Sequence, residues 1–352
     1  MSGILFDGRW IRPGMTGVGI SAYNLLSAIG RTNVHYGVIS CHEASLPIMG
    51  PNGHLHRMRI DLDTHPVTEI FEQMGIPILC WIHGYSNFVS FEGRVPLLHP
   101  GIGTYSYIQD LSILKLPSSH SLKYVTFLKM TLLISRLSAT QLITGSETVK
   151  SDIVKLMGTN PKRILVWPHA DSGLNKFREK AIPDLGLPFF LSVGMTNPRK
   201  NLDLLLDAFQ LLHSQNPSIR LYLTGNPAWL KEKIEQRGKI GVTSLGFVSE
   251  GELLYLFRHA EALIYPSKDE GFGIPLVDAW KEGCPVLCSD IPVFHEIMGQ
   301  YADYFNCESA NSLASKLKEH KGRISWVERT PPPIEYSWER TAALLIKALI
   351  NP

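Results

Sequence analysis

The sequence is poor in cysteine and has no arrangement of cysteines typical of a cross-linked or metal-binding protein. Its five cysteines include no Cys-x-x-Cys pair and are scattered along the chain, at Cys41, Cys80, Cys284, Cys288 and Cys307. A disulfide framework and a zinc site are therefore not expected, and a reducing cytosol is favoured.

Long apolar runs and a strong charge excess are missing as well. No stretch approaches the roughly 18 apolar residues that a membrane span needs, so we expect none. The first residues carry Asp7, Arg9 and Arg12 where a signal peptide needs an apolar core. A formal net charge of +2 is too close to neutral to indicate a nucleic-acid partner. These absences predict a cytoplasmic chain.

Short apolar runs alternate with longer helical periods along all 352 residues, a length that suits two domains. The expected strands are 4–6, 36–40, 77–82, 104–108, 140–144, 163–167, 189–193, 219–224, 242–248, 262–266 and 285–289. The expected helices include 21–29, 148–157, 201–213 and 249–260. Such alternation predicts an α/β fold of parallel sheets covered on both faces.

A turn-rich stretch at 168–188 separates two blocks of this alternation, which predicts two Rossmann-like domains. We place the first domain at 1–168 and the second at 169–336. A last helix, at 337–352, follows a proline run and is expected to begin at a Ser337 cap.

Two loops that follow expected strands in the second half carry charge and glycine. GMTNPRKN (194–201) places Arg199 and Lys200 before a helix with Asn201 as the expected cap, a suitable place for phosphate. DEGFGIPLVDAW (269–280) contains the carboxylates of Glu270 and Asp278, on either side of a glycine turn. The glycines let the backbone approach a ligand closely. Carboxylates suit the hydroxyls of a sugar. The alternatives are a solvated basic pair and an ordinary glycine turn before a helix.

Two loops in the first half are weaker candidates. Gly17 and Gly19 formally match the dinucleotide motif G-x-G-x-x-A, but about nine residues separate them from the strand, where the motif allows none. We interpret them as a glycine-rich lip that admits a second substrate. Gln109 and Asp110 follow an expected strand, although an Asx-type turn would explain them equally well.

Three further patterns are discounted. Asp61 and Asp63 resemble a metal-binding Asp-x-Asp pair but have no supporting context. His54 and His56 share one strand face but lack a third ligand. The apolar stretch 121–137, with its basic residues, suits a membrane surface but is more often a core helix whose lysines reach solvent.

Taken together, the loops resemble the family 4 glycosyltransferases, retaining enzymes of the GT-B architecture, in which a cleft separates two Rossmann-like domains. The resemblance covers nearly the whole chain and is strongest between Phe190 and Ser289. The motifs that carry it are a strand ending in VG, then PRKN, LTG, LGFVS, ALIYPS, EGFGIPLVDA and GCPVLCSD. The opening stretch ILFDGRWIRPGMTGVGISAYNLL is similar to the mannosyltransferase-like branch. The closing SWERTA is similar to a family helix that crosses back onto the first domain.

The resemblance assigns a role to each of these positions. It implies that Glu270 meets the transferred sugar, that Asp278 holds the ribose, and that Lys200 binds the diphosphate with Arg199 beside it. The remaining implied donor-site residues are Gly17, Gly19, Gly194, Gly246, Phe247, Val248, Gly271, Phe272, Gly273 and Ile274. The family uses no metal and no cofactor, so only a nucleoside-diphosphate sugar is expected as donor.

Three departures from the family pattern affect the catalytic expectations. Asp278 is one methylene shorter than the usual Glu, and Met195 stands where many members have Arg. Gln109 stands before Asp110 where the family has a histidine that contacts the donor sugar and assists catalysis. Either this histidine role is not essential here, or another histidine, His83 or His169, supplies it.

The resemblance implies transfer of a hexose, with mannose favoured, to a glycan or lipid-linked acceptor in the synthesis of a bacterial surface polysaccharide. GDP-mannose is the favoured donor, and peripheral contact with the inner face of the cytoplasmic membrane is compatible with the sequence. A decayed transferase serving as a sugar-nucleotide-binding or scaffold subunit is one alternative. A nicotinamide-dependent oxidoreductase, based on Gly17 alone, is another.

Overall fold

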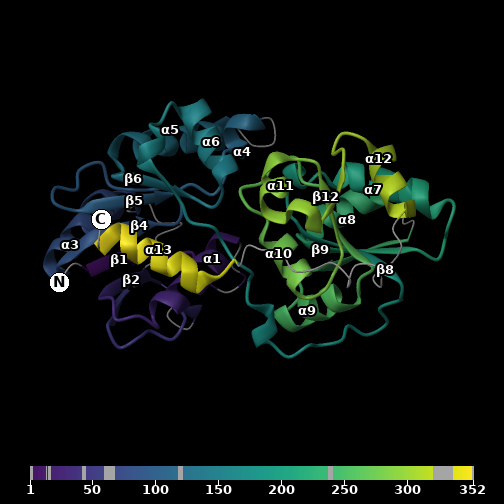
Figure 1. Cartoon of the computed structure of the whole chain (residues 1–352), viewed down its shortest axis with the longest axis horizontal. Coiled ribbons are helices and arrows are strands. Elements are labelled where there is room, and N and C mark those ends of the chain that lie inside the picture. Colours follow the sequence, from purple (N-terminus) through teal and green to yellow (C-terminus); the bar gives the residue numbers. More distant parts are fainter. Residues whose placement is uncertain are drawn as a thin grey trace. The chain divides into compact units, whose positions relative to one another are not determined.

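In the computed structural model, the described residues are 3–12, 14, 17–41, 45–58, 68–117, 122–236, 241–319 and 336–350. The chain divides into two compact units, one comprising Met1–Ala170 with Tyr336–Pro352 and the other Asp171–Glu335. We call them unit 1 and unit 2 (Figure 1). Asp61, Asp63 and the proline run at 331–333 lie outside the described residues.

Unit 1 is built on a seven-stranded sheet whose strands all run parallel, in the order β3-β2-β1-β4-β5-β6-β7. The strands are β1 (Gly3–Asp7), β2 (Tyr36–Ser40), β3 (Gly53–Arg57), β4 (Tyr85–Ser90), β5 (Gly103–Tyr107), β6 (Gln141–Thr144) and β7 (Ile164–Val166). The chain order reverses between β1 and β4. Loops that follow these two strands therefore meet at the edge where such sheets bind ligands.

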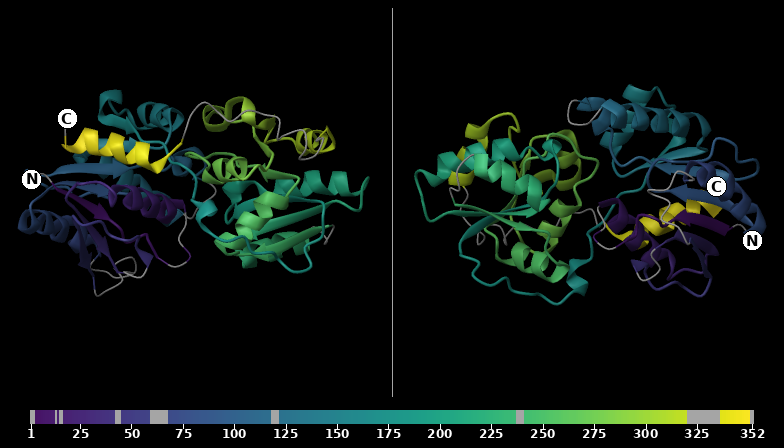
Figure 2. Two further views of the ribbon diagram at one scale, coloured as in Figure 1. Left: turned by 60° about the horizontal axis from the view of Figure 1, so that its bottom comes forward. Right: turned by 180° about the vertical axis from the view of Figure 1, so that it is seen from behind.

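Helices cover both faces of this sheet. They are α1 (Gly17–Ile29), α2 (Thr68–Ile70), a π-helical turn η2 (Phe71–Gly75), α3 (Ile76–His83), α4 (Ser112–Lys115), α5 (Leu122–Ser138), α6 (Glu147–Met157) and α13 (Trp338–Ile350). The last helix lies beside α1 (Figure 2), and the two share a core that contains Leu25 and Leu345. A second core joins α3 and α6 to the other face, through residues such as Cys80 and Ile153.

Unit 2 has a six-stranded parallel sheet in the order β10-β9-β8-β11-β12-β13. Its strands are β8 (Phe189–Met195), β9 (Arg220–Gly225), β10 (Val242–Gly246), β11 (Ala262–Tyr265), β12 (Val286–Ser289) and β13 (Asp303–Phe305). Its helices are α7 (Leu202–His213), α8 (Pro227–Gln236), α9 (Glu250–His259), α10 (Ile274–Lys281), α11 (Pro292–Met298) and α12 (Ala310–Glu319). Here the order reverses between β8 and β11. The Rossmann-like parallel sheets expected from the sequence are confirmed in both units.

One expected strand is wrong. Residues 77–82 form most of α3 and not a strand, because Pro77 lies in its first turn and Gly84 ends it in the left-handed conformation, with φ of 70°. A six-residue apolar run fits a buried helix as well as a strand. The neighbouring strand is β4, which has fewer apolar residues and was not expected.

Two local expectations about helix starts also fail. Asn201 does not cap α7 with its side chain. Its backbone is left-handed, with φ of 57°, and its side-chain amide donates to the carbonyls of Pro266 and Cys307 in other loops. Gly17 and Gly19 lie in the first turn of α1 and do not form a loose lip. The Ser337 cap is confirmed, since its hydroxyl accepts a hydrogen bond from Arg340 N at 3.2 Å.

Candidate active site

The loops that follow β8 and β11 lie side by side, because these strands are neighbours in the sheet of unit 2. The first contains a short 3₁₀ turn, Pro198–Lys200, that carries both cations predicted to bind phosphate. The second contains Glu270 and leads into α10. The order reversal between the two strands makes this edge the expected ligand site of the sheet.

Glu270 binds both predicted cations at once. Lys200 Nζ lies 2.7 Å from Glu270 Oε1, and Arg199 Nη1 lies 2.9 Å from Oε2. Lys200 also donates to the Tyr265 hydroxyl at 2.7 Å and lies over that ring, and Arg199 also donates to the Asp269 carbonyl at 2.6 Å. Lys200 and Glu270 are each 8% exposed, so the centre of this cluster is largely shielded from water.

The electrostatics of the cluster keep its groups ionised. Burial by itself would raise the pKa of Glu270, but Lys200 and Arg199 outweigh it and lower the pKa to about 2. Burial would lower the pKa of Lys200, but Glu270 outweighs it and the pKa is raised. Near neutral pH the cluster therefore holds one anion between two cations and carries a net positive charge.

Backbone contacts fix the two loops to each other. The Lys268 amide donates to the Arg199 carbonyl at 3.0 Å, and the Asn201 side chain donates to the carbonyls of Pro266 and Cys307. The left-handed conformation of Asn201 turns the chain from the 3₁₀ turn into α7. Arg199 and Lys200 are thus held against the second loop before any ligand binds.

The glycine turn before α10 is sterically confined. Gly273 has φ of 101°, and a Cβ on it would come within 3.1 Å of Leu276 and 3.2 Å of Phe294. Pro275 lies in the first turn of α10, as expected. Gly271 and the buried Phe272 precede the turn, and Ile274 begins the helix, so the amides predicted to face a donor lie at one helix start.

Two further glycines predicted to face the donor, Gly194 and Gly246, end or nearly end strands of this sheet, whereas Gly17 and Gly19 lie in unit 1. Gly194 has φ of 68° and open space where a Cβ would be, and the register of β8 shifts there. Met195 is buried, and a Cβ on Gly225 would come within 2.2 Å of its carbonyl. The predicted base-binding positions Gly246, Phe247 and Val248 end or follow β10, with the Phe247 side chain exposed.

Asp278 makes a separate set of contacts. Its carboxylate accepts hydrogen bonds from Ser172, at 2.7 Å from the amide and 2.9 Å from the hydroxyl. Burial is the largest influence on this carboxyl, and it raises the pKa to about 7 despite the two donors. Asp278 also lines a hollow of about 330 Å³, together with Asp171, Leu174, Asn175, Arg258, Lys281 and Glu282.

In unit 1, Gln109 contacts a buried histidine. The Gln109 Oε1 atom lies 3.2 Å from His169 Nε2, which also lies 3.2 Å from the Tyr107 hydroxyl. Burial lowers the pKa of His169 to about 3, so its ring is neutral near pH 7. Asp110 accepts from the amide and hydroxyl of Ser112, at 3.0 and 2.7 Å, in the Asx-type arrangement that was the plainer expectation.

His83 is not near Gln109. It ends α3, before the amino end of β4, whereas Gln109 follows the carboxyl end of the neighbouring strand β5. Its ring packs on His56, with centroids 4.5 Å apart. Of the two histidines suggested as substitutes, only His169 contacts Gln109.

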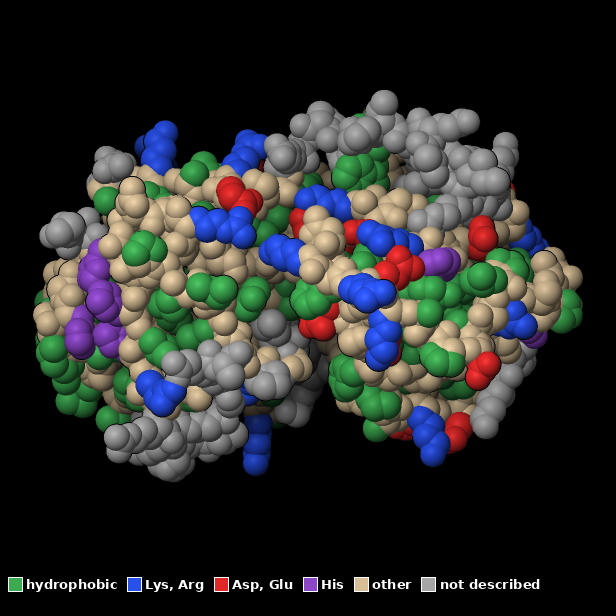
Figure 3. Space-filling model, turned by 90° about the horizontal axis from the view of Figure 1, so that it is seen from below, with side chains coloured by type: hydrophobic (Ala, Val, Ile, Leu, Met, Phe, Trp, Pro, Cys, Tyr) green, Lys and Arg blue, Asp and Glu red, His purple; other side chains and the backbone are tan. Residues whose placement is uncertain are grey.

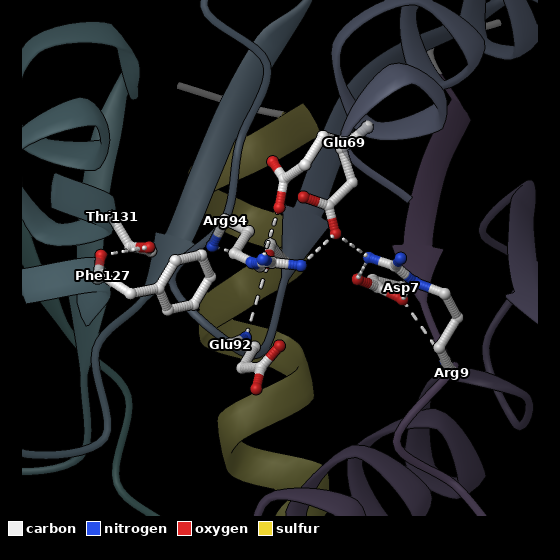
Figure 4. Close-up of polar contacts among 9 residues, drawn as sticks. Asp7, Arg9, Glu69, Glu92, Arg94, Phe127 and Thr131 are labelled. Carbon is white, nitrogen blue, oxygen red and sulfur yellow. Dashed lines mark hydrogen bonds and ion pairs between the residues drawn. The ribbon is translucent and has the colours of Figure 1, made fainter. Parts of the chain in front are cut away.

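The charged network at the switch point of unit 1 was not expected from the sequence. Asp7 ends β1 and binds Arg9 at 2.7 Å, and Arg9 reaches Glu72 at 2.8 Å (Figure 4). Arg94, after β4, binds Glu72 at 2.9 Å and Glu69 at 2.8 Å. The sequence does not indicate that Arg9 pairs with Glu72, because the two residues are 63 positions apart. The position of Asp7 at the end of a strand was the only sign of a polar group at this edge of the sheet. Arg9 is 3% exposed, so the network positions loops and is not an open site.

One of the discounted metal patterns, His54 with His56, lies in the described part of unit 1. His54 and His56 belong to a group with His35, His83 and Tyr85, and histidines gather at one edge of unit 1 (purple in Figure 3). His56 Nε2 lies 2.8 Å from the Tyr85 hydroxyl. Within the described ranges, no three His, Cys, Asp or Glu side chains are placed to hold a metal ion. Among the helices of those ranges, none has the length and apolar character to cross a membrane.

Comparisons with known proteins connect this geometry to a family. Residues 175–320 match the family model of the group 1 glycosyl transferases. The O-antigen chain mannosyltransferase B of Escherichia coli is 28% identical over 286 residues, 76% of this chain and 75% of that protein. The O-antigen chain mannosyltransferase RfbU of Salmonella typhimurium is 34% identical over 178 residues, 50% of this chain and 49% of that protein.

Solved structures agree on the fold. WaaG, a glycosyltransferase involved in lipopolysaccharide biosynthesis, superposes with a TM-score of 0.73 at 16% identity, covering 99% of this chain and 100% of that one. Sucrose-phosphate synthase from Thermosynechococcus elongatus gives 0.71 at 16% identity, covering 99% and 98%. The group 1 match, the mannosyltransferase relatives and the two parallel sheets together support a glycosyltransferase of the family 4 type, with the GT-B architecture.

Proposed function

We propose that the enzyme transfers a hexose, with mannose favoured, from a nucleoside-diphosphate sugar to a hydroxyl of a glycan or lipid-linked acceptor. The observation that carries this proposal is the buried cluster of Lys200, Glu270 and Arg199 at the switch point of unit 2. Two cations on one turn suit a diphosphate, and a carboxylate that reaches both of them from the adjacent loop suits sugar hydroxyls.

Departure of the nucleoside diphosphate builds negative charge, and the cluster supplies the compensating charge. Arg199 and Lys200 are held in place by Asn201 and Tyr265, so little reorganisation is needed when that charge develops. The amides at the start of α10 add further donors. Side chains and backbone amides therefore supply the stabilisation in this proposal, in which the reaction needs no metal ion.

Glu270 orients the sugar in this proposal and accepts no proton. Its low pKa keeps it an anion that accepts hydrogen bonds from sugar hydroxyls. No side chain of the cluster is a suitable nucleophile, because Glu270 is neutralised by two cations. We therefore propose that the acceptor attacks from the face that the diphosphate leaves, with the leaving phosphate taking the proton and the anomeric configuration retained.

The choice of mannose rests on the relatives. Both O-antigen relatives are mannosyltransferases, and the opening stretch of this chain is similar to the same branch. GDP-mannose is therefore the proposed donor, and a bacterial surface polysaccharide is the proposed product. A lipid-linked acceptor would bring the enzyme to the inner face of the cytoplasmic membrane as a peripheral protein.

The proposal is tested by incubating the enzyme with GDP-mannose and mannosylated acceptors, and by determining the anomeric configuration of the product by NMR. The expected product is an α-mannoside, formed equally well after treatment with EDTA. A β-linked product would overturn retention, and loss of activity with EDTA would overturn metal independence. If a scaffold role is correct, no acceptor yields product although the nucleotide binds.

A further inference from the structure

A large apolar surface lies on unit 1. It consists of two helical stripes, on α2 to α3 and on α5, and of the loop between β4 and β5. We call it the apolar surface. Its exposed members are Ile70, Met74, Ile78, Trp81, Ile82, Leu97, Leu98, Leu122, Tyr124, Phe127, Met130, Leu133 and Leu137. An exposed apolar area of this extent marks an interaction site.

The stripe on α5 is apolar and bordered by cations. Leu122, Met130, Leu133 and Leu137 fall within about a quarter of the helix circumference, since successive residues are turned by roughly 100°. Met130 is 60% exposed and Leu137 67%. The basic residues Lys123, Lys129 and Arg136 flank the stripe, and α5 contains no acidic residue.

The stripe on α2 to α3 repeats at helical spacing. Ile70, Met74, Ile78 and Ile82 are four residues apart, and each is exposed, Ile82 to 72%. Trp81 is 54% exposed and donates from its indole nitrogen to the Pro100 carbonyl at 3.2 Å. A tryptophan with one polar contact and an open ring face suits a boundary between water and an apolar phase.

The loop between β4 and β5 joins the two stripes. The Leu97 amide donates to Gln73 of η2 at 2.8 Å, and His99 Nε2 lies 2.8 Å from the Ser138 carbonyl at the end of α5. Leu98, between these contacts, is 79% exposed. The stripes and the loop therefore form one connected surface.

Arg94 adds a second connection. Its guanidinium binds Glu69 and Glu72 on one side and lies over the ring of Phe127 on the other, 5.0 Å from the centroid (Figure 4). It therefore ties α2 and η2 to α5. Among the described acids close to the surface, Glu69 and Glu72 are paired with Arg94, and Glu92 and Asp110 lie near Tyr124.

We propose that the apolar surface docks unit 1 on a lipid bilayer with anionic headgroups. Leucine, isoleucine and aromatic side chains enter the boundary between headgroups and acyl chains, while the lysines and the arginine of α5 meet the lipid phosphates. The charge pattern selects this partner over a second copy of the chain, because a symmetric contact would bring like cations together. The inference rests on the proposed function, because a lipid-linked acceptor gives the enzyme a reason to bind a membrane. The surface itself is defined by the exposed residues and contacts of unit 1.

Co-sedimentation with vesicles of phosphatidylcholine and phosphatidylglycerol, mixed at about two to one, tests the proposal against pure phosphatidylcholine vesicles. The wild type is expected to bind the anionic vesicles at least about tenfold more tightly, with the preference reduced by salt. Two double variants should each abolish binding, namely Met130→Asp/Leu133→Asp and Ile78→Asp/Ile82→Asp. A third double variant, Lys123→Glu/Lys129→Glu, should remove the preference for anionic vesicles. Leu344→Asp, on α13 at the opposite face of the sheet, should bind as the wild type does.

Unaltered circular dichroism and an unaltered thermal shift with GDP show that the variants are folded. Retained vesicle binding in both Asp pairs would overturn the docking surface without touching the donor site. Vesicle binding without any nucleotide response would instead overturn the proposed function alone. A concentration-dependent dimer that only the Asp pairs disrupt would assign the surface to self-association.

Discussion

Lys200 Nζ and Glu270 Oε1 lie 2.7 Å apart inside unit 2, where two neighbouring loops bring opposite charges out of water. Arg199 completes the arrangement from the same turn as Lys200. Removing one member of such a buried pair leaves the other charge without a partner, which costs more than the pair contributes when intact.

The first prediction concerns the charge of Glu270. Glu270→Gln keeps the shape but leaves two cations uncompensated, so the free energy of unfolding should fall by about 3 kcal/mol. Glycosyl transfer should fall by about a hundredfold or more, because the sugar loses its charged hydrogen-bond acceptor. Urea unfolding and initial rates measure the two effects. Glu250→Gln, on the exposed start of α9, should change neither.

The second prediction concerns His169. Because burial lowers its folded pKa to about 3, the ring should not titrate between pH 5 and 8 in the native protein. The unfolded ring binds a proton below about pH 6.5, so this residue makes stability fall as pH drops from there toward the folded pKa. NMR of the imidazole resonances measures the titration directly. A midpoint above pH 6 would show that His169 is a cation near neutrality.

The third prediction concerns Asp278, whose folded pKa is raised to about 7. Between the unfolded value of about 3.9 and the folded value, the native state binds the extra proton. This carboxyl therefore contributes stability at low pH that is lost as pH rises through that window. Asp278→Asn should flatten the dependence and stabilise the protein at pH 8 by on the order of 2 kcal/mol.

Urea unfolding of Asp278→Asn and of the wild type at pH 4, 6 and 8 measures this difference. A wild type whose stability rises steadily over the same range, with no change in the variant, would contradict the assignment. In that case the two hydrogen bonds from Ser172 would outweigh burial and hold the carboxyl ionised.

The fourth prediction compares two glycines. Gly273→Ala should destabilise unit 2 by about 1–2 kcal/mol, because φ of 101° is strained for any side chain and Leu276 and Phe294 crowd the new methyl. Gly17→Ala meets open space at the start of α1 and should stabilise unit 1 by up to about 1 kcal/mol. Thermal unfolding of both variants measures the contrast, and equal shifts would show that backbone strain at Gly273 is absent.

The sequence was most informative where local chemistry decides the structure. Strand and helix alternation predicted the parallel sheets, and Glu270, Lys200 and Arg199 were identified because their loops follow strands. The sequence could not distinguish the apolar run at 77–82 from a strand, since β4 is the less apolar neighbour. It also could not show that Glu270 binds both cations, because the pairing joins residues 70 and 71 positions apart.

Some positions were misjudged for a physical reason that sequence alone does not reveal. Asn201 has the composition of a helix cap, but its side chain is recruited by the carbonyls of Pro266 and Cys307. The contacts of Asp278 with Ser172 and of Gln109 with His169 likewise depend on tertiary structure. Arg94 carried no recognisable motif, and Tyr265 lies in the ALIYPS motif without a predicted role, so only their partners in the structure give them one.

The most direct test of the account is a thermal-shift panel with GDP, UDP, ADP, dTDP and NAD, applied to the wild type, Lys200→Ala and Lys268→Ala. Lys268 is an exposed lysine in the adjacent loop and serves as the matched control. A ligand at a hundred times its dissociation constant stabilises the folded state by about 2.7 kcal/mol. We expect a shift with one nucleoside diphosphate, GDP favoured, that is retained in Lys268→Ala and lost in Lys200→Ala. A flat response to all four nucleoside diphosphates, or a shift with NAD alone, would contradict it.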